Sequence, residues 1–166
     1  MVASDVRERR LALLQETVRR ANAGRVSIVR VPTQGPLPLA GHFDRVLVDA
    51  PCSGLGTIRR DPDIRWRRHE DELEGLARDQ FALLMRAADV VRPGGRLVYS
   101  TCSSEPEEND GVVAMFVSAR TDFRRVDLRG DAHPVLTPFI DAAGVFRTAP
   151  DPHGLEAFFA AGLVRA

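Results

Sequence analysis

Two cysteines and one aspartate could act together as a covalent catalytic group in this chain of 166 residues. Asp49 and Cys52 lie in the stretch DAPCSG, and Cys102 lies in the stretch STCSS. A cysteine thiolate is a strong nucleophile, and a carboxylate beside it can hold a substrate through hydrogen bonds. These three side chains therefore predict nucleophilic chemistry, provided that the fold brings them to one place.

Each cysteine also has a less specific interpretation. A free cysteine is most often a small buried hydrophobe, and two cysteines do not make a disulfide framework in a chain of this size. A thiol redox pair is a weaker alternative, because the spacing is not C-x-x-C. Cys102 precedes an expected helix, whose N-terminus would lower the pKa of the thiol. The carboxylates of Glu105, Glu107 and Glu108 would oppose this effect, and we expect them to face solvent.

Two buried strands must position these side chains. The run at 43–50 is apolar and rich in β-branched residues, and Pro51 ends it because proline lacks a backbone donor. The run at 96–101 leads directly into Cys102, and an expected helix over 70–91 joins the two strands. If the strands are parallel neighbours, their carboxyl ends lie together. That edge of an open α/β sheet is where ligands bind.

The rest of the chain alternates between helix and strand. Further helices are expected at 6–22 and 104–119, the second with Ser104 and Glu107 as a capping box. Strands and extended segments are expected at 25–31, 123–128, 146–149 and 155–163. Residues 1–5 indicate no element of their own, and 52–69 reads as an irregular loop. This alternation predicts an α/β fold with a mostly parallel sheet, in a single domain over 1–166.

The composition argues against a general electrostatic attraction to nucleic acid. The 23 basic residues, all of them arginine, balance 23 acidic residues, so any RNA contact must come from a local patch. The candidate patch surrounds Trp66 and could contact phosphates and stack on bases. Its arginines are Arg59, Arg60, Arg65 and Arg67. The alternative is a solvated loop balanced by Asp61, Asp63 and Glu70.

Asp5 and Asp49 each have two interpretations. Asp5 lies where a strand would end, so it could bond ribose hydroxyls as in dinucleotide-binding folds, or it could cap the following helix. Asp49 is either a turn residue or a carboxylate that bonds a substrate donor at the ligand edge. The spacing of histidine and cysteine indicates no metal site. No apolar run could span a membrane and no signal peptide is visible, so we expect a cytoplasmic protein.

These motifs resemble those of the Sun/Fmu-type RNA cytosine-5 methyltransferases. The stretch DAPCSGLGTIRRDPDIRW at 49–66 is similar to the substrate motif, and PGGRLVYSTCSSEPEEND at 93–110 is similar to the nucleophile motif. The stretch SDVRERRL at 4–11 resembles the ribose-binding motif. RTAPDPHGLEAFFAAGL at 147–163 resembles the C-terminal strand motif, with Glu-Ala where Asp-Gly is usual. The resemblance implies a class I methyltransferase fold that uses S-adenosylmethionine.

The resemblance also implies roles for individual residues. Cys102 would be the nucleophile that adds to C6 of a flipped-out cytosine, Asp49 would bond the edge of the base, and Cys52 would assist product release. The implied cofactor contacts are Asp5, Thr33, Asp49 and Pro51. The implied RNA contacts are Arg59, Arg60, Arg65, Trp66 and Arg67. The family likeness favours ribosomal RNA as the substrate.

Two departures from the family pattern affect the cofactor half. The family carries a glycine-rich loop and its strand upstream of the ribose aspartate, where this chain begins, and Thr33 replaces an aspartate that contacts adenine. We therefore expect a partial domain that is incomplete on its N-terminal side and binds S-adenosylmethionine poorly. The strand at 43–49 would keep an unpaired edge that self-associates or takes a partner segment. The alternatives are an inactive RNA-binding remnant and a thiol redox protein.

Overall fold

A computed structural model describes residues 1–130 and 132–166, and the chain divides into two compact units, Met1–Ala40 and Gly41–Ala166. The first unit contains two parallel strands connected by a helix. Its elements are β1 (Val2–Asp5), α1 (Glu8–Arg20) and β2 (Ser27–Arg30). The expectation that residues 1–5 form no element is wrong. They form a strand because their backbone pairs with β2, a partner that no local sequence pattern reveals.

The second unit is built on a five-stranded sheet. Its strands are β3 (Phe43–Asp49), β4 (Val91–Thr101), β5 (Phe123–Val126), β6 (Phe146–Thr148) and β7 (Phe158–Arg165). The order is β3-β4-β7-β5, and β6 also pairs with β7. β3 and β4 are parallel neighbours, as predicted. The sheet is mixed rather than mostly parallel, because β7 runs antiparallel to β4, β5 and β6.

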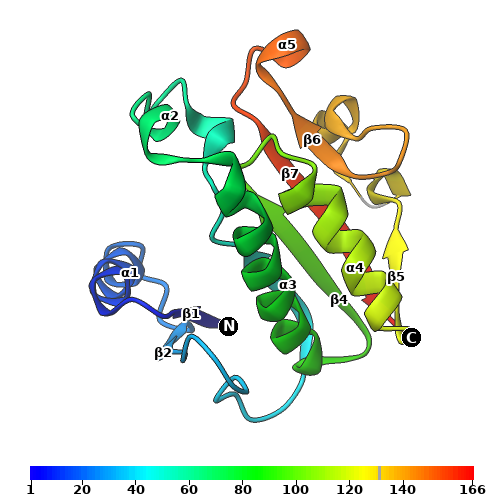
Figure 1. Cartoon of the computed structure of the whole chain (residues 1–166). Helices are drawn as coiled ribbons and strands as arrows, with labels where there is room; N and C mark the ends of the chain where they lie inside the picture. Colours follow the sequence, from blue (N-terminus) through cyan, green and yellow to red (C-terminus); the bar gives the residue numbers. More distant parts are fainter. Residues whose placement is uncertain (131) are drawn as a thin grey trace. The chain divides into compact units, whose positions relative to one another are not determined.

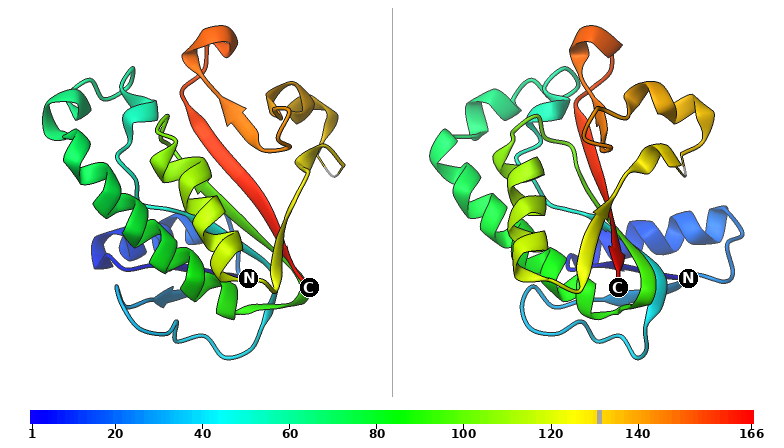
Figure 2. Two further views of the ribbon diagram at one scale, coloured as in Figure 1. Left: turned by 45° about the vertical axis from the view of Figure 1, so that its right-hand side comes forward. Right: turned by 90° about the vertical axis from the view of Figure 1, so that its right-hand side faces the viewer.

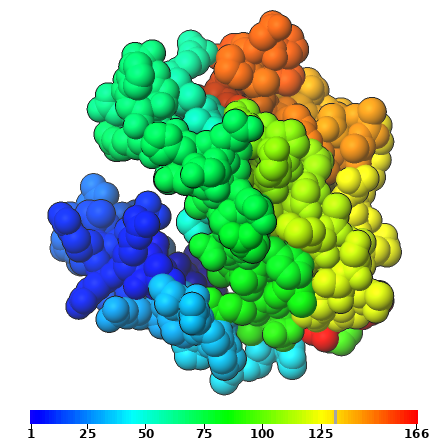
Figure 3. All heavy atoms as spheres, viewed as in Figure 1, coloured from blue at the N-terminus to red at the C-terminus, as the bar shows by residue number. Residues whose placement is uncertain are grey.

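Two long helices cover one face of this sheet (Figures 1 and 2). They are α3 (Leu73–Asp89) and α4 (Val112–Ala119), and Figure 3 shows them side by side at the surface. Leu97 and Tyr99 of β4 alternate with more exposed neighbours and are fully buried, with Leu84 of α3 and Phe116 of α4 in the same core. Each such side chain contributes about 1.5–3 kcal/mol by leaving water. The strand periodicity thus fixes β4 beneath both helices.

The connecting segments contain more short helical turns than the sequence suggested. The expected loop at 52–69 includes a turn at Leu55–Thr57 and α2 (Ile64–Arg67), and α5 (Pro150–His153) precedes β7. The expected helix at 104–119 begins instead with a π-helical turn at Glu107–Gly111. Further short turns lie at Glu70–Glu72, Leu128–Gly130 and Pro134–Phe139. Within the described ranges, no helix is long and apolar enough to cross a bilayer.

The predicted capping box does not form. Ser104 Oγ donates to the carboxylate of Glu105 instead of holding a helix N–H group. The neighbouring Ser103 Oγ accepts from the backbone N–H of Glu105 at 3.1 Å, so the turn into the helix is made one residue earlier than expected. The expectation that Glu108 faces solvent is also wrong, because this residue is buried within the π-helical turn.

Candidate active site

The two cysteines meet at the carboxyl ends of β3 and β4. Asp49 pairs in register with Ser100, and the backbone N–H of Ala50 donates to the carbonyl of Ser100 at 2.9 Å. The chain then turns so that Cys52 Sγ lies 3.3 Å from Cys102 Sγ, with both side chains half-buried. The structure therefore brings together the two thiols that the crossover rule placed at one edge of the sheet.

Backbone hydrogen bonds fix the loop that carries Cys52. The N–H of Gly56 donates to the carbonyl of Cys102 at 3.0 Å, and the carbonyl of Gly56 accepts from the N–H of Ala157 at 2.9 Å. A Cβ atom on Gly56 would lie 2.1 Å from the carbonyl oxygen of Ala157 and 2.8 Å from that of Cys102. Only glycine therefore fits at this junction of three segments.

The contact between the sulfurs gives the two thiols opposite acidities. The hydrogen bond from Cys52 lowers the pKa of Cys102 to about 7, against opposing effects of burial and of the Asp49 carboxylate. The same hydrogen bond and burial raise the pKa of Cys52 well above its usual range. The prediction that a helix N-terminus activates Cys102 is wrong in its cause, because the helical turn begins only at Glu107. These opposite shifts make Cys102 the thiol that ionises first, with Cys52 as the hydrogen-bond donor to its thiolate.

Alkylation of Cys102 is expected to follow this acidity. Its rate with iodoacetamide should rise with pH around a midpoint near 7, because only the thiolate reacts. Cys52→Ala removes the hydrogen bond, so the midpoint should move up towards about 8.5 and the rate at neutral pH should fall more than roughly tenfold. Peptide mass spectrometry measures both quantities, and Cys102→Ala identifies the fast site. An unchanged midpoint in Cys52→Ala would contradict the assigned donor.

A glutamate that the sequence placed at the surface is instead buried beside these loops. Glu108 is 0% exposed, and its carboxylate accepts hydrogen bonds from Ser53 and Ser103, the residues that follow the two cysteines. Gln80 of α3 is also fully buried and donates to Glu108 and to the carbonyl of Pro51. A helical pattern that counts only apolar residues as buried misses both side chains. The serine after each cysteine was the one available signal.

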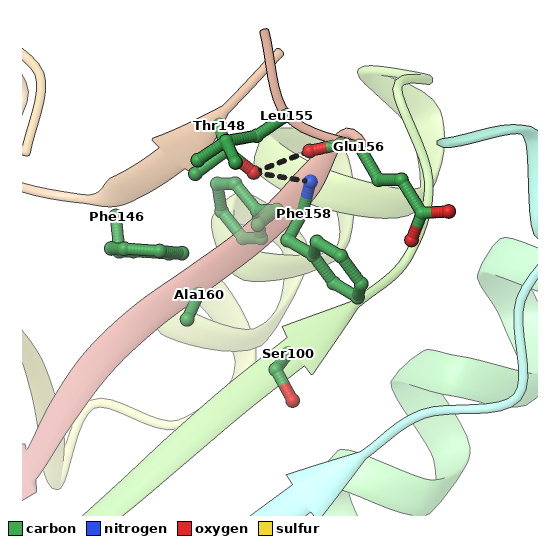
Figure 4. Close-up of a pocket in the computed structure, with 8 residues that line it drawn as sticks. Ser100, Phe146, Thr148, Leu155, Glu156, Phe158 and Ala160 are labelled. Atoms are coloured by element: carbon green, nitrogen blue, oxygen red, sulfur yellow. Dashed lines mark hydrogen bonds between the residues drawn. The ribbon is translucent and has the colours of Figure 1, made fainter. Parts of the chain in front are cut away.

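An apolar pocket of about 470 Å³ lies beside the strand ends (Figure 4). Ser100 forms part of its lining and alternates with the buried Tyr99, so the pocket lies on the opposite face of the sheet from that core residue. Phe146 and Phe158 also line the pocket. Thr148 Oγ1 donates to the carbonyl of Glu156 at 2.6 Å, which holds the start of β7 against β6.

The expected cofactor residues fall in both units. Asp5 is the last residue of β1, and its Oδ1 accepts from the backbone N–H of Arg7 at 2.7 Å, while Oδ2 lies 3.8 Å from Arg10 Nη1. Asp5 is not the N-cap of α1, which is Arg7. Its partly exposed carboxylate retains acceptor capacity, so it fits a ribose hydroxyl. Thr33 is exposed in the loop after β2.

Asp49 and Pro51 lie in the second unit, at the end of β3. Both are exposed, and the carbonyl of Pro51 accepts from Gln80 Nε2 at 3.0 Å. The Asp49 carboxylate is therefore available to solvent at the same sheet edge as the thiols. Pro51 ends β3 because it lacks a backbone donor, and its carbonyl connects the Cys52 loop to α3 through the hydrogen bond from Gln80.

The arginine loop is partly occupied by contacts within the chain. Arg59 Nη1 donates to the carbonyl of Gly154 at 3.1 Å, Arg60 lies 3.4 Å from Glu156, and Arg67 pairs with Asp63. Such exposed pairs are weak, on the order of 0–1 kcal/mol, and a phosphate can displace them. Figure 1 shows α2 and α5 at the same end of the second unit.

The exposed ring of Trp66 is the other feature of this loop. Trp66 is 72% exposed, and the guanidinium of Arg65 lies 4.9 Å from the centre of its ring. Arg68, which the sequence did not select, instead supports the loop that carries Cys52: its Nε donates to the carbonyl of Ser53 at 3.0 Å. The exposed Trp66 ring is therefore available for stacking, while Arg68, at the end of the loop, supports the segment that carries Cys52.

Comparison with known proteins places this arrangement in a family. A model of the 16S rRNA methyltransferase RsmB/F family matches residues 1–164. The probable ribosomal RNA small subunit methyltransferase B of Bacillus subtilis (strain 168) is 40% identical over 119 residues, which are 71% of this chain and 26% of that protein. The ribosomal RNA small subunit methyltransferase B of Klebsiella pneumoniae (strain 342) is 33% identical over 99% of this chain and 36% of that protein.

Solved structures agree with this assignment. The crystal structure of NSun6 from Pyrococcus horikoshii with SFG matches with a TM-score of 0.82 and 29% identity, over 99% of this chain and 41% of that one. The α/β methyltransferase fold class predicted from the sequence is thereby confirmed. The chain spans between about a quarter and about two fifths of the length of these three relatives.

Proposed function

The chain belongs to the RsmB/F family of 16S rRNA methyltransferases, and from that premise we propose that it methylates C5 of cytosine in ribosomal RNA with S-adenosylmethionine. The observation that supports this most is the 3.3 Å contact between Cys52 Sγ and Cys102 Sγ at the ligand edge of the sheet. Cytosine C5 is a poor nucleophile, and addition of a thiolate to C6 is the chemistry that activates it.

We propose a role for each group in that reaction. Cys102 Sγ bonds to C6 and pushes an electron pair towards C5, while Asp49 holds the N3/N4 edge of the base. When bound, the cofactor would supply the methyl group that C5 takes. Loss of the C5 proton to a base then breaks the C6–S bond, and Cys102 leaves as a thiolate. The hydrogen bond from Cys52 stabilises that leaving thiolate for the same reason that it lowers the pKa of Cys102.

The apolar pocket is where we place the flipped-out base. Ser100, which forms part of its lining, pairs in register with Asp49 on the neighbouring strand. Phe158 is 39% exposed and offers a ring for contact with the base. Removal of this ring by Phe158→Ala would weaken base binding without touching either thiol.

The cofactor contacts are proposed from the donor chemistry of the residues. The Asp5 carboxylate would accept ribose hydroxyls, Thr33 can give one neutral hydrogen bond to adenine, and Asp49 and Pro51 would face the methionine end. We further propose that the two units belong to one catalytic domain over 1–166. Incubation with methyl-labelled S-adenosylmethionine and small-subunit rRNA tests the function, and label recovered in a nucleoside other than 5-methylcytidine would refute the assigned position.

The arginine loop is expected to control RNA affinity more than chemistry. Replacing Arg59, Arg60, Arg65 and Arg67 together with alanine should weaken RNA binding and lower the slope of log affinity against log salt, by roughly one unit for each phosphate that the loop no longer binds. Fluorescence anisotropy across a salt series measures the slope. Arg78→Ala is the control, since Arg78 is an exposed arginine on α3 that pairs with Glu74. An unchanged slope would mean that the cluster is only a solvated loop.

The edge of β3 predicts weak self-association or capture of a partner segment. In the described part of the chain, β3 pairs with β4 on one side only, and Leu47 on this strand is 69% exposed. Such an edge templates strand pairing, which a charged residue discourages. Sedimentation should show concentration-dependent association that Leu47→Lys reduces, and calorimetry should show weak binding of S-adenosylmethionine. A monomer with low-micromolar cofactor affinity would refute this prediction.

A thiol redox protein is the second candidate, and the same sulfur contact favours it. The thiols are close enough to oxidise to a disulfide with little movement of the loops. That function predicts a reversible Cys52–Cys102 disulfide at cellular redox potentials and no covalent bond to RNA. The third candidate, an inactive RNA-binding remnant, predicts RNA binding with neither reaction.

A further inference from the structure

One buried carboxylate connects the two catalytic loops. Glu108 Oε1 accepts hydrogen bonds from the backbone N–H of Ser53 at 2.8 Å and from Gln80 Nε2 at 2.8 Å. Its Oε2 accepts from Ser53 Oγ at 2.6 Å and from Ser103 Oγ. Ser53 directly follows Cys52, and Ser103 directly follows Cys102. The carboxylate thus contacts the residue after each cysteine.

Burial of the Glu108 carboxylate costs folding free energy, which its hydrogen bonds must offset. A carboxylate is almost never fully buried, because loss of water destabilises its charge unless several donors replace it. Four neutral donors do so here, and Tyr99 Oη also donates to the backbone carbonyl of Glu108 at 2.6 Å. Well-packed apolar residues would stabilise the core at least as well. The polar arrangement therefore points to a role in geometry.

Further bonds make the two loops a single rigid assembly. Arg68 Nε donates to the carbonyl of Ser53 at 3.0 Å, and Gln80 Nε2 donates to the carbonyl of Pro51 at 3.0 Å. On the other loop, Asn109 Nδ2 donates to the carbonyl of Ser103 at 2.9 Å. Movement of either loop would break these hydrogen bonds as well as those to the Glu108 carboxylate.

We propose that Glu108 is a positioning residue, which holds the two cysteine loops so that Cys52 Sγ and Cys102 Sγ stay in contact. This inference rests on the proposed function, since it names the group that prepares the nucleophile for attack. Glu108 acts through its hydrogen bonds to Ser53 and Ser103, and none of the hydrogen bonds of its carboxylate goes to a sulfur atom. Its effect on Cys102 is therefore an effect on where Cys52 lies.

Two variants of Glu108 distinguish its effect on the position of the loops from the effect of its charge on the ionisation of Cys102. The negative charge of Glu108 by itself opposes ionisation of Cys102, as do the Asp49 carboxylate and burial, whereas contact with Cys52 favours it most strongly. Glu108→Gln removes the charge but keeps a side chain that can bond both serines, so the pH midpoint of Cys102 alkylation should stay or fall. Glu108→Ala releases both loops, so the midpoint should rise from about 7 towards the usual value of about 8.5.

A second readout reports the sulfur distance directly. Formation of the Cys52–Cys102 disulfide with oxidised glutathione needs the two sulfurs close together, so Glu108→Ala should slow it by about tenfold or more while Glu108→Gln keeps most of the rate. Glu107→Ala is the matched control, because Glu107 is the exposed neighbour with the same charge. Circular dichroism and thermal melting establish that each variant is folded.

Single serine variants keep the test decisive if Glu108→Ala does not fold. Ser53→Ala and Ser103→Ala each remove one donor to Glu108 and leave its charge in place, so either should raise the alkylation midpoint and slow the disulfide. If both serine variants, or folded Glu108→Ala, kept the wild-type alkylation midpoint of Cys102 and the wild-type rate of disulfide formation, the proposal would be overturned. A fall of the midpoint in Glu108→Ala to match Glu108→Gln would overturn it as well, since that result indicates an effect of charge alone.

These thiol measurements need neither RNA nor S-adenosylmethionine. If the chain never methylates RNA but the thiol readouts change as expected, the proposed function fails and the positioning role of Glu108 stands. If methylation occurs and the thiol readouts do not change, the positioning role fails and the proposed function stands.

Discussion

Replacement of Cys102 by alanine is expected to abolish RNA methylation, while replacement of Cys52 is expected to trap RNA on the protein. Cys102→Ala removes the group that bonds to C6, and loss of a nucleophile in other enzymes costs at least roughly 10⁴-fold in rate. Cys52→Ala leaves the nucleophile in place but removes the hydrogen bond that stabilises the departing Cys102 thiolate. The methylated adduct should therefore form more slowly, because the Cys102 thiol is less acidic in this variant, and should then fail to resolve.

The measurement is a denaturing gel of protein incubated with labelled cytosine RNA and S-adenosylmethionine. A shifted band that survives denaturation is expected in Cys52→Ala and absent in Cys102→Ala and in the double variant. Ser104→Ala serves as a control, since Ser104 is exposed and lies two residues from the nucleophile. If Cys102→Ala alone gave the adduct, the roles of the two cysteines would be exchanged, and if no variant gave one, the covalent mechanism would fail.

The Gly56→Ala variant is expected to damage both stability and the active site. Its new methyl group would lie 2.1 Å from the carbonyl oxygen of Ala157, which belongs to the backbone and cannot rotate away. The Cys52 loop would have to move, which would break the hydrogen bonds that join Gly56 to Cys102 and Ala157. We expect destabilisation by about 3 kcal/mol or more, which lowers the melting temperature by roughly 10 °C.

A matched control comes from α3. The nearest atom to a Cβ on Gly75 is Arg78 Nη2 at 4.0 Å, so Gly75→Ala has room. Because alanine is the better helix former, that variant should be more stable by about 0.5–1 kcal/mol. Differential scanning calorimetry of both variants gives the comparison, and the alkylation midpoint of Cys102 shows whether the loop has moved. A wild-type melting temperature in Gly56→Ala would show that the three segments are not tightly joined.

The local sequence pattern was sufficient to predict the two strands that carry the site. An apolar β-branched run ending at Asp49, and a second run ending at Thr101, define two buried strands by composition and length alone. A helical crossover between neighbouring strands makes them parallel, and parallel neighbours finish at the same edge of the sheet. The placement of Cys52 and Cys102 at one edge of the sheet follows from these two facts, whereas their contact at 3.3 Å depends on how the two loops pack.

Only the tertiary structure decided how that pair is held and activated. Glu108 reads as one of several surface glutamates in the sequence, and it is buried because a π-helical turn rotates it towards donors from Ser53, Gln80 and Ser103. The low pKa of Cys102 likewise comes from Cys52, 50 residues away, and not from the adjacent helix. The sequence predicted the nucleophile and determined the edge of the sheet at which both cysteines lie. The distant hydrogen bonds that position it have no local signature, because nothing within one segment shows which donors from other segments will reach it.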